Sequence, residues 1–283
     1  MKTILITGAS RGLGLHLTKY FWSEGYSLIL VARNLNQLKV ILAELPKRTD
    51  QTFHMIQCDL SDFNEIERLS QKLRVEHKDI DVVINNAAIQ GTIGGLCDVT
   101  PLELQRVFNV NLFAPMELCR VAVASMKRRN SGSIINISGG GGPSARVNFH
   151  PYSASKAALI RFSENLSQEL KYTEITVNCV APGVMKTEMM KEILEAGIEK
   201  SGAGEIKVAR NALENSDENY DNVTSLINFL MSPASNGITG KLISAKWDNW
   251  REWPKFIEIL TNSDVYTLGR IVGRDRNFEQ GDI

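Results

Sequence analysis

The stretch Thr7-Gly8-Ala9-Ser10-Arg11-Gly12-Leu13-Gly14 joins an apolar run at the N-terminus to a segment whose apolar residues recur with a helical period. Glycines between a strand and a helix let the chain turn tightly and bring backbone N–H groups against a pyrophosphate. A plain glycine turn is the alternative, but the position after the first strand favours phosphate binding. The candidate contacts are Gly8, Ser10, Arg11, Gly12, Leu13 and Gly14.

Short apolar runs alternate with helical patterns along most of the chain. Several of the runs are almost entirely apolar, which is typical of parallel strands covered on both faces. The alternation predicts an α/β fold with one doubly wound parallel sheet of about seven strands and helices on both faces. The predicted strands are Thr3–Thr7, Ser27–Val31, Thr52–Cys58, Asp81–Asn85, Ser133–Ile137, Thr176–Ala181 and Lys241–Ala245.

Two stretches depart from this alternation and define the predicted organisation. We expect one main domain over residues 1–245, with a helical substrate lid over 187–219, and a C-terminal extension over 246–283. The extension carries Trp247, Trp250 and Trp253, spaced so that they fall close to one helix face. These rings either pack the extension onto the body or form an aromatic platform for a sugar or a base.

Composition excludes several classes of protein. Lysine plus arginine and aspartate plus glutamate each total 32, so the formal net charge is zero, which argues against nucleic-acid or membrane partners. The longest apolar run is far below the ~20 residues that span a bilayer. Four cysteines and four histidines are scattered without a metal-ligand spacing, so no metal is expected. A strand-like run from Thr3 leaves no room for a signal peptide, and we expect a cytoplasmic protein with reduced cysteines.

The ends of the second, third and fourth strands carry further candidate cofactor contacts. Arg33 follows the second strand where an NAD site usually has an acid, and with Arg11 it could bind a 2′-phosphate, so we expect NADP(H). The alternative is that both arginines are solvated surface charges. Asp59 could accept a hydrogen bond from an adenine amino group. The other candidates at these ends are Leu60, Asn86, Ala87 and Ala88.

Tyr152 and Lys156 open the long helical segment after the fifth predicted strand. Residues at i and i+4 share one helix face. Free tyrosine has a pKa near 10, and a nearby ammonium would lower that pKa and ease proton exchange at neutral pH. The spacing therefore predicts a proton-transfer pair.

Together these motifs resemble those of the short-chain dehydrogenases/reductases over roughly residues 1–245. The resemblance rests on Thr7–Gly14, Asp59, Asn85–Ala88, Asn111, Tyr152 with Lys156, and Pro182-Gly183. It implies a Rossmann-like sheet that binds NAD(P), a water held by Asn111 in a proton relay behind Lys156, and binding of the nicotinamide ribose by Lys156. It also implies that the nicotinamide is lined by Pro182, Gly183, Met185 and Thr187.

One departure from the family concerns the serine that usually binds the substrate oxygen. Without a gap, that position is Gly139, and Ser138 lies one residue early, followed by Gly139–Gly142. A slip of one residue reverses the side-chain direction, but glycines could relax the geometry. Ser138 could thus be re-aimed into the site. Alternatively, Asn148, His150 or a backbone N–H replaces it, or the site is catalytically weak.

The sequence thus favours an NADP(H)-dependent carbonyl reductase or alcohol dehydrogenase that acts on a small molecule. The glycine run and the extension loosely resemble proteins of surface-polysaccharide and nucleotide-sugar metabolism, which suggests a sugar or nucleotide-sugar substrate. The alternative is an NADP-binding partner or sensor protein with little turnover. Helices at Leu102–Arg128 and Tyr152–Lys171 match those with which family members form homodimers or homotetramers, although Val121, Val123, Leu159 and Phe162 suit a core equally well.

Overall fold

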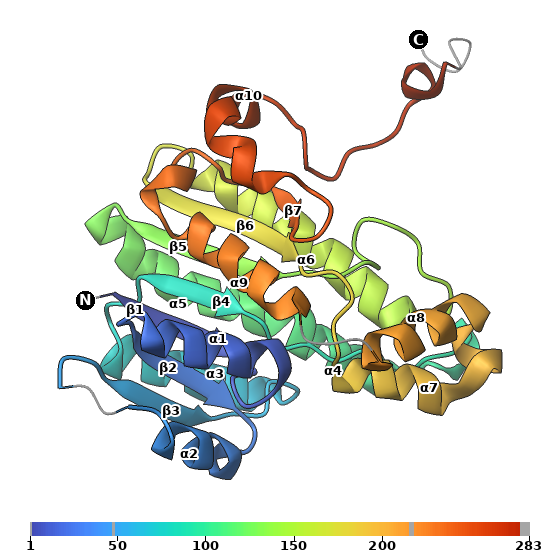
Figure 1. Cartoon of the computed structure of the whole chain (residues 1–283), viewed down its shortest axis with the longest axis horizontal. Helices are drawn as coiled ribbons and strands as arrows, with labels where there is room; N and C mark the ends of the chain where they lie inside the picture. The colour runs from blue at the N-terminus through green and yellow to red at the C-terminus, as the bar shows by residue number, and fades with distance from the viewer. Residues whose placement is uncertain (1, 47–48, 215–217, 278–283) are drawn as a thin grey trace.

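Seven parallel strands form one sheet in the computed structural model, which describes residues 2–46, 49–214 and 218–277 (Figure 1). The strand order is β3-β2-β1-β4-β5-β6-β7. The predicted α/β sheet is confirmed, and each predicted strand end lies within one residue of the observed end. The strands are β1 (Thr3–Thr7), β2 (Ser27–Ala32), β3 (Phe53–Gln57), β4 (Val82–Asn85), β5 (Gly132–Ile137), β6 (Ile175–Ala181) and β7 (Leu242–Ser244).

Helices cover both faces of the sheet, as the two buried clusters show. The first cluster packs α1 (Gly12–Ser23), α2 (Leu35–Ala43) and α9 (Glu218–Leu230) on one face. The second packs α3 (Phe63–Glu76), α5 (Ala114–Arg129) and the partly buried side of α6 (His150–Glu169) on the other. The remaining helical segments are α4 (Pro101–Phe108), a π-helical turn (Asn109–Phe113), α7 (Glu188–Ser201), α8 (Ala203–Glu214), α10 (Ile257–Asn262) and four 3₁₀ turns (Leu96–Asp98, Pro233–Ser235, Trp250–Phe256, Gly273–Arg276).

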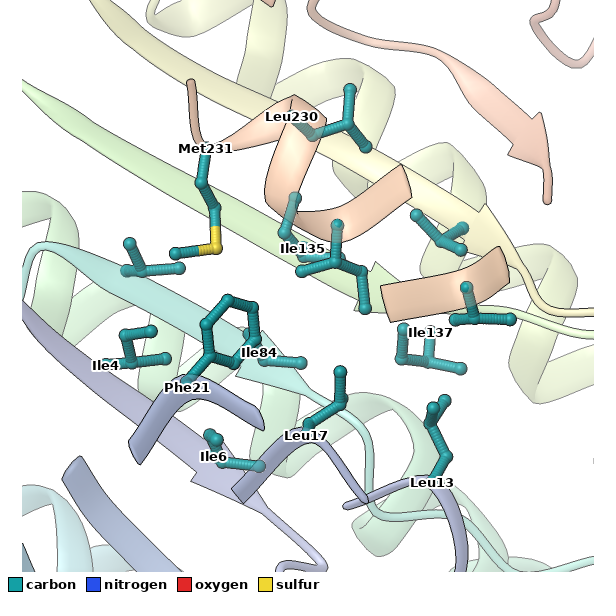
Figure 2. Packing of buried hydrophobic residues seen from close by; sticks show 14 of the residues in the cluster. Ile4, Ile6, Leu13, Leu17, Phe21, Ile84, Ile135, Ile137, Leu230 and Met231 are labelled. Carbon is teal, nitrogen blue, oxygen red and sulfur yellow. The ribbon is translucent and has the colours of Figure 1, made fainter. Parts of the chain in front are cut away.

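The apolar periodicity of α1 directs its side chains onto the sheet. Leu17 and Phe21 are buried against Ile4 and Ile6 of β1 (Figure 2). Burial of side chains of this size contributes about 1.5–3 kcal/mol each. On the opposite face the positions that suited a core or an interface equally well, such as Val121 and Leu159, are buried within the chain.

One helical stretch, Pro101–Arg129, is long and apolar enough to cross a membrane by length and composition alone. Its most apolar window has a mean hydropathy of 1.3, and 67% of that window is buried inside the fold. Such burial is also found in the core helices of globular proteins.

The predicted lid region forms helices beyond the carboxyl ends of the strands (Figure 1). α7 contains a break at Gly197, whose φ of 78° lies in the left-handed region that glycine tolerates. α8 follows after Gly202, and residues 215–217 of the predicted lid lie outside the described residues. The lid is thus a pair of helices beside the edge of the sheet where the candidate site residues gather.

The C-terminal extension does not place its three tryptophans on one face. Trp250 and Trp253 belong to the same buried cluster as α1 and α9, whereas Trp247 is 77% exposed. The expectation of a shared helix face is wrong because Trp250–Phe256 forms a 3₁₀ turn that contains Pro254, so the spacing of an α-helix does not apply. Packing on the body accounts for two of the rings. Residues 278–283 of the extension lie outside the described residues, and a domain division at residue 245 stays a prediction.

A middle segment of the tail, residues 263–266, also covers the outer edge of β7. Leu242 N donates to the Tyr266 carbonyl oxygen at 2.7 Å. The buried ammonium of Lys241 donates to the carbonyl oxygens of Ser263 and Val265 at 2.8 and 3.0 Å. The tail therefore supplies backbone partners to an edge strand that would otherwise present unpaired groups.

The burial of Trp253 predicts a large effect of its removal. Trp253→Ala should lower the free energy of unfolding by about 3–5 kcal/mol, because it deletes a buried indole that contacts the Tyr266 ring at a tilted angle, with ring centroids 4.6 Å apart. Trp247→Ala is the matched control and should change stability by less than about 0.5 kcal/mol. Urea unfolding of both variants measures this, and equal effects would contradict the assigned packing.

Candidate active site

The glycine turn after β1 has the backbone geometry of a phosphate cradle. Gly8 and Gly12 have φ values of 66° and 52°, which favour glycine. A Cβ on Gly14 would overlap the Gly8 carbonyl oxygen, so glycine also permits the close approach of α1 to the turn. The residue before α1, Arg11, makes no side-chain bond to the helix N-terminus. The first N–H groups of α1 are therefore left without that cap, and the turn fits a pyrophosphate.

The end of β4 lies directly against this turn. The Thr7 hydroxyl accepts hydrogen bonds from the N–H groups of Asn86 and Ala87, each at 3.0 Å. Asn86 Nδ2 also donates to the Thr7 carbonyl oxygen at 2.9 Å. The structure thus brings the predicted contacts at Asn86 to Ala88 beside the glycine turn, at the point where the strand order reverses between β1 and β4.

Arg11 and Arg33 are exposed, and Arg33 lies close enough to Asp59 for its positive charge to lower the pKa of that carboxyl. Burial raises the pKa of Asp59, but hydrogen bonds from the Ser61 N–H and hydroxyl and the charges of Arg33 and Arg106 together lower it below its ordinary value. Leu60 is buried in the cluster on the α3 and α5 face. The lowered pKa keeps the Asp59 carboxyl ionised at neutral pH, so it can accept a hydrogen bond.

The segment after β6 approaches the turn from the other side. Pro182 is buried, Gly183 has a φ of 81°, and Met185 packs against the α1 cluster. The methyl group of Thr187 lies 3.9 Å from where a Cβ on Gly12 would stand. These residues occupy the predicted place, and their contacts with a nicotinamide stay a prediction.

Tyr220 is a residue of this region that the sequence motifs did not indicate. Its hydroxyl donates to the Lys186 carbonyl oxygen at 2.7 Å and lies 3.8 Å from the Cβ position of Gly12. Its ring stacks on His16 of α1 with centroids 5.5 Å apart. Tyr220 therefore connects α9, α1 and the start of the lid. No short motif surrounds it, and only the fold brings these segments together.

Tyr152 and Lys156 are both buried in the first turns of α6. Lys156 Nζ donates to the Ile137 carbonyl oxygen at the end of β5, at 2.7 Å, and lies 5.9 Å from the centre of the Tyr152 ring. Burial lowers the pKa of Lys156 to about 8. Burial raises the pKa of Tyr152 above 10.0, while Arg146 acts in the opposite direction. The expected lowering of the phenol pKa is not found in this structure, because desolvation outweighs the positive charge beside the ring.

Asn111 lies in the π-helical turn between α4 and α5 and is fully buried. Its amide accepts from Ile89 N at 3.0 Å and donates to the Ile89 carbonyl oxygen at 2.9 Å and to Ser155 Oγ at 3.0 Å. π-helical turns often mark functional sites. Here the turn ties the segment after β4 to α6, and the predicted relay water stays a prediction.

The glycine run after β5 packs tightly on the start of α6. A Cβ on Gly139 would overlap the Tyr152 hydroxyl and lie 3.1 Å from its Cζ atom. The Ser138 hydroxyl is buried, has no hydrogen-bond partner, and lies 3.0 Å from the Cβ position of Gly142. The backbone of Gly139, rather than the Ser138 hydroxyl, thus faces the tyrosine in this conformation.

The other donors that could replace the serine are used elsewhere or exposed. Asn148 Nδ2 donates to the Lys200 carbonyl oxygen of α7 at 2.8 Å. His150 is exposed at the first position of α6. The third alternative, a backbone N–H of the glycine run, stays a prediction.

The lid covers Tyr152 with apolar side chains. Tyr152 shares a buried cluster with Phe149 of the preceding loop, Ile193 of α7 and Ile206 of α8. Gln90, in the segment after β4, donates to the Met189 carbonyl oxygen at 2.8 Å. The lid therefore packs on Tyr152, which is buried, and is tied to the segment after β4.

Known proteins share this arrangement. Residues 2–197 match the family model of the short chain dehydrogenases. The chain is 33% identical to the ketoacyl reductase HetN of Nostoc over 213 residues, which is 75% of this chain and 74% of that protein. The chain therefore belongs to the short-chain dehydrogenase/reductase family, whose members are oxidoreductases that use NAD(P)(H).

Two solved structures illustrate the range of this family. YwfH, an NADPH-dependent reductase involved in bacilysin biosynthesis, superposes with a TM-score of 0.74 at 26% identity, over 86% of this chain and 96% of that one. A 4-hydroxyisoleucine dehydrogenase complexed with NADH superposes with a TM-score of 0.73 at 27% identity, with the same coverage of 86% and 96%. One relative thus uses NADPH and the other binds NADH.

The contact between Gly139 and Tyr152 predicts that a serine at this position is harmful. Gly139→Ser should lower the turnover of a reporter ketone at least about tenfold, because its Cβ displaces a tyrosine that is packed under the lid. Gly140→Ser is the matched control and should keep normal turnover, because a Cβ there meets nothing within 4 Å. An increase in turnover for Gly139→Ser would mean that the variant restores a missing donor, and would contradict this prediction.

Proposed function

We propose that the chain is an NADP(H)-dependent carbonyl reductase or alcohol dehydrogenase in which Tyr152 acts as the general acid and base. The observation that carries the proposal is the buried pair Tyr152 and Lys156, which lies beyond the carboxyl end of β5, while the phosphate cradle lies beyond that of β1. Ligands of open α/β sheets bind beyond this edge. A dinucleotide on the cradle could therefore extend along the edge toward the tyrosine.

In this proposal, a bound nicotinamide supplies the hydride for reduction or accepts it in oxidation. Tyr152 donates its proton to the carbonyl oxygen as the alcohol forms and takes it back in the reverse direction. Lys156 stabilises the phenolate by its positive charge and holds the nicotinamide ribose. Asn111 anchors α6 through Ser155. The buried environment keeps the proton transfer separate from bulk water.

The proposed preference for NADP(H) rests on the two arginines at the edge of the cradle. Among the described residues, neither Arg11 nor Arg33 forms a salt bridge, and their charges act on Glu188 and Asp59 only at longer range, so both guanidinium groups could pair with a 2′-phosphate. Val31-Ala32-Arg33 has no acid that would bind a ribose 2′-hydroxyl. The relatives with NADPH and NADH are compatible with either choice.

The proposed substrate is a small molecule with a ketone or secondary alcohol. The name of the ketoacyl reductase relative supports a ketone. A sugar or nucleotide sugar stays part of the proposal as a second substrate class, and Trp247 is the one tryptophan of the extension exposed enough to serve as an aromatic platform.

We also propose that the chain is cytoplasmic and forms a homodimer or homotetramer. Support for assembly comes from the stretch between Pro101 and Arg129, where Leu102, Phe113 and Met116 are exposed apolar side chains. Such side chains are frequent at subunit interfaces.

The second candidate function is a cofactor-binding partner or sensor with little turnover. Gly139 at the position of the usual serine and the raised pKa of Tyr152 both favour it. Loss of one donor to a developing charge costs about 10²–10³ in rate, which slows the chemistry without ending it.

Replacement of the tyrosine separates the two candidates. Tyr152→Phe should reduce NADPH-dependent reduction of ethyl acetoacetate by about 10²–10⁴, because the proton donor is lost. Binding of NADPH, followed by its fluorescence, should remain. Unchanged NADPH consumption in the variant would refute the proposed catalytic role.

A second variant tests the proposed cofactor preference. Arg33→Ala should weaken NADPH binding by about 10- to 100-fold, because a charge-assisted hydrogen bond is lost, and should leave NADH binding nearly unchanged. Arg128→Ala, an exposed arginine at the C-terminus of α5, is the control and should affect neither. Equal weakening of both dinucleotides by Arg33→Ala would refute the 2′-phosphate role.

A further inference from the structure

The loop between β5 and α6 is joined to the lid by an ion pair that the site described above does not use. Arg146 Nε donates to Glu205 Oε1 at 2.9 Å, and its Nη2 donates to Glu205 Oε2 at 2.6 Å. Glu205 lies in the first turn of α8. The side chains are only 17% and 29% exposed. A half-buried bidentate pair has a defined geometry and is stronger than an exposed single contact.

The same guanidinium lies against the start of α6. Arg146 Cζ lies 3.6 Å from the centre of the Phe149 ring and 5.8 Å from the centre of the Tyr152 ring. Phe149 and Tyr152 are three residues apart and belong to one buried cluster with Ile193 and Ile206 of the lid. Arg146 therefore makes two kinds of contact. Its charge pairs with Glu205 of the lid, and the face of its guanidinium lies against the aromatic ring of Phe149 at the start of α6.

Few charged groups face Tyr152. Lys156, on the same helix, lies 5.9 Å from the ring centre and donates to the Ile137 carbonyl oxygen. Arg146 approaches from the loop and Glu205 from the lid helix, while His150 is exposed on the first turn of α6. Removal of Glu205 would leave the charge of Arg146 without its counter-ion, whereas removal of Arg146 would leave Tyr152 with Lys156 alone.

We propose that Arg146 is a positioning residue of this site, which joins Glu205 of the lid to the Phe149–Tyr152 turn, holds the tyrosine ring under the lid, and presents a second positive charge to it. A second anchor of the same loop supports this, since Asn148 donates to the Lys200 carbonyl oxygen at the end of α7. The two anchors lie on either side of the α7–α8 junction at Gly202. The proposal rests on the proposed function, because it concerns the same tyrosine.

The predicted consequence is that the two halves of the ion pair have opposite effects on Tyr152. Burial raises the pKa of Tyr152, and the charge of Arg146 lowers it. In Arg146→Met the phenol should ionise at higher pH than in the wild-type chain. In Glu205→Gln it should ionise at lower pH, because the arginine keeps its charge and loses the neutralising carboxylate. Arg146→Lys keeps the charge and should restore most of the wild-type behaviour.

Ultraviolet difference titration tests this without any substrate. Each variant is titrated beside the same protein carrying Tyr152→Phe, so that the difference isolates the ionisation of this one phenol. The expected order of midpoints is Arg146→Met above wild type and Glu205→Gln below it. If the phenol ionises at the same pH in both variants as in the wild-type chain, or if both variants shift its midpoint in the same direction, the proposal is overturned. A purely structural link would give such a result, because the loss of either partner would break the same ion pair.

Kinetics separate this proposal from the proposed function. With ethyl acetoacetate and NADPH, Arg146→Met should lose about tenfold in kcat at neutral pH, whereas Glu205→Gln should mainly raise KM. Equal losses of kcat in both variants overturn the proposal. If Tyr152→Phe leaves turnover unchanged, the proposed function fails, and the titration still decides whether Arg146 acts on Tyr152.

Discussion

The bond between the Lys156 ammonium and the Ile137 carbonyl oxygen is the constraint on which the candidate site depends. An ammonium buried without a partner costs several kcal/mol, so α6 must dock where the end of β5 offers that oxygen. The neighbouring Asn136 reinforces this docking, since it accepts from Asn85 of β4 at 2.8 Å and donates to Ser163 of α6 at 2.7 Å. Tyr152, one turn before Lys156, is thereby placed beside the end of the sheet.

The topology of the sheet brings the remaining parts to the same edge. The strand order reverses between β1 and β4, and the glycine turn after β1 lies against Asn86 and Ala87 after β4. The lid helices α7 and α8 follow β6 and lie beyond this edge (Figure 1). The candidate site is thus built at one edge of the sheet by the segments that follow β1, β4, β5 and β6. These segments carry the phosphate cradle, the apolar cluster around Tyr152, and the charges of Arg146 and Glu205.

The strands and the main motifs could be predicted from the sequence because buried parallel strands have continuous apolar runs and because the motif residues follow them directly. The geometry at Gly139 could not, since the backbone angles of four consecutive glycines are not determined by local preference. Arg146 and Glu205 are 59 residues apart, and no periodicity links them. Tyr220 reaches Lys186 only through the packing of α9. The tryptophan spacing in the extension was misleading because a 3₁₀ turn with Pro254 replaces the α-helix that the spacing assumes.

In the proposed mechanism, Tyr152 exchanges a proton with the substrate oxygen beside an NADP(H) site, and Gly139 stands at the position where the family resemblance implies a serine. A crystal structure of the chain with NADP⁺ and an alcohol product tests it most directly. We expect the alcohol oxygen within hydrogen-bond distance of the Tyr152 hydroxyl, the 2′-phosphate paired with Arg33, and the Ser138 hydroxyl still buried away from the substrate. An alcohol oxygen bound away from Tyr152, or gripped by a reoriented Ser138, would contradict it.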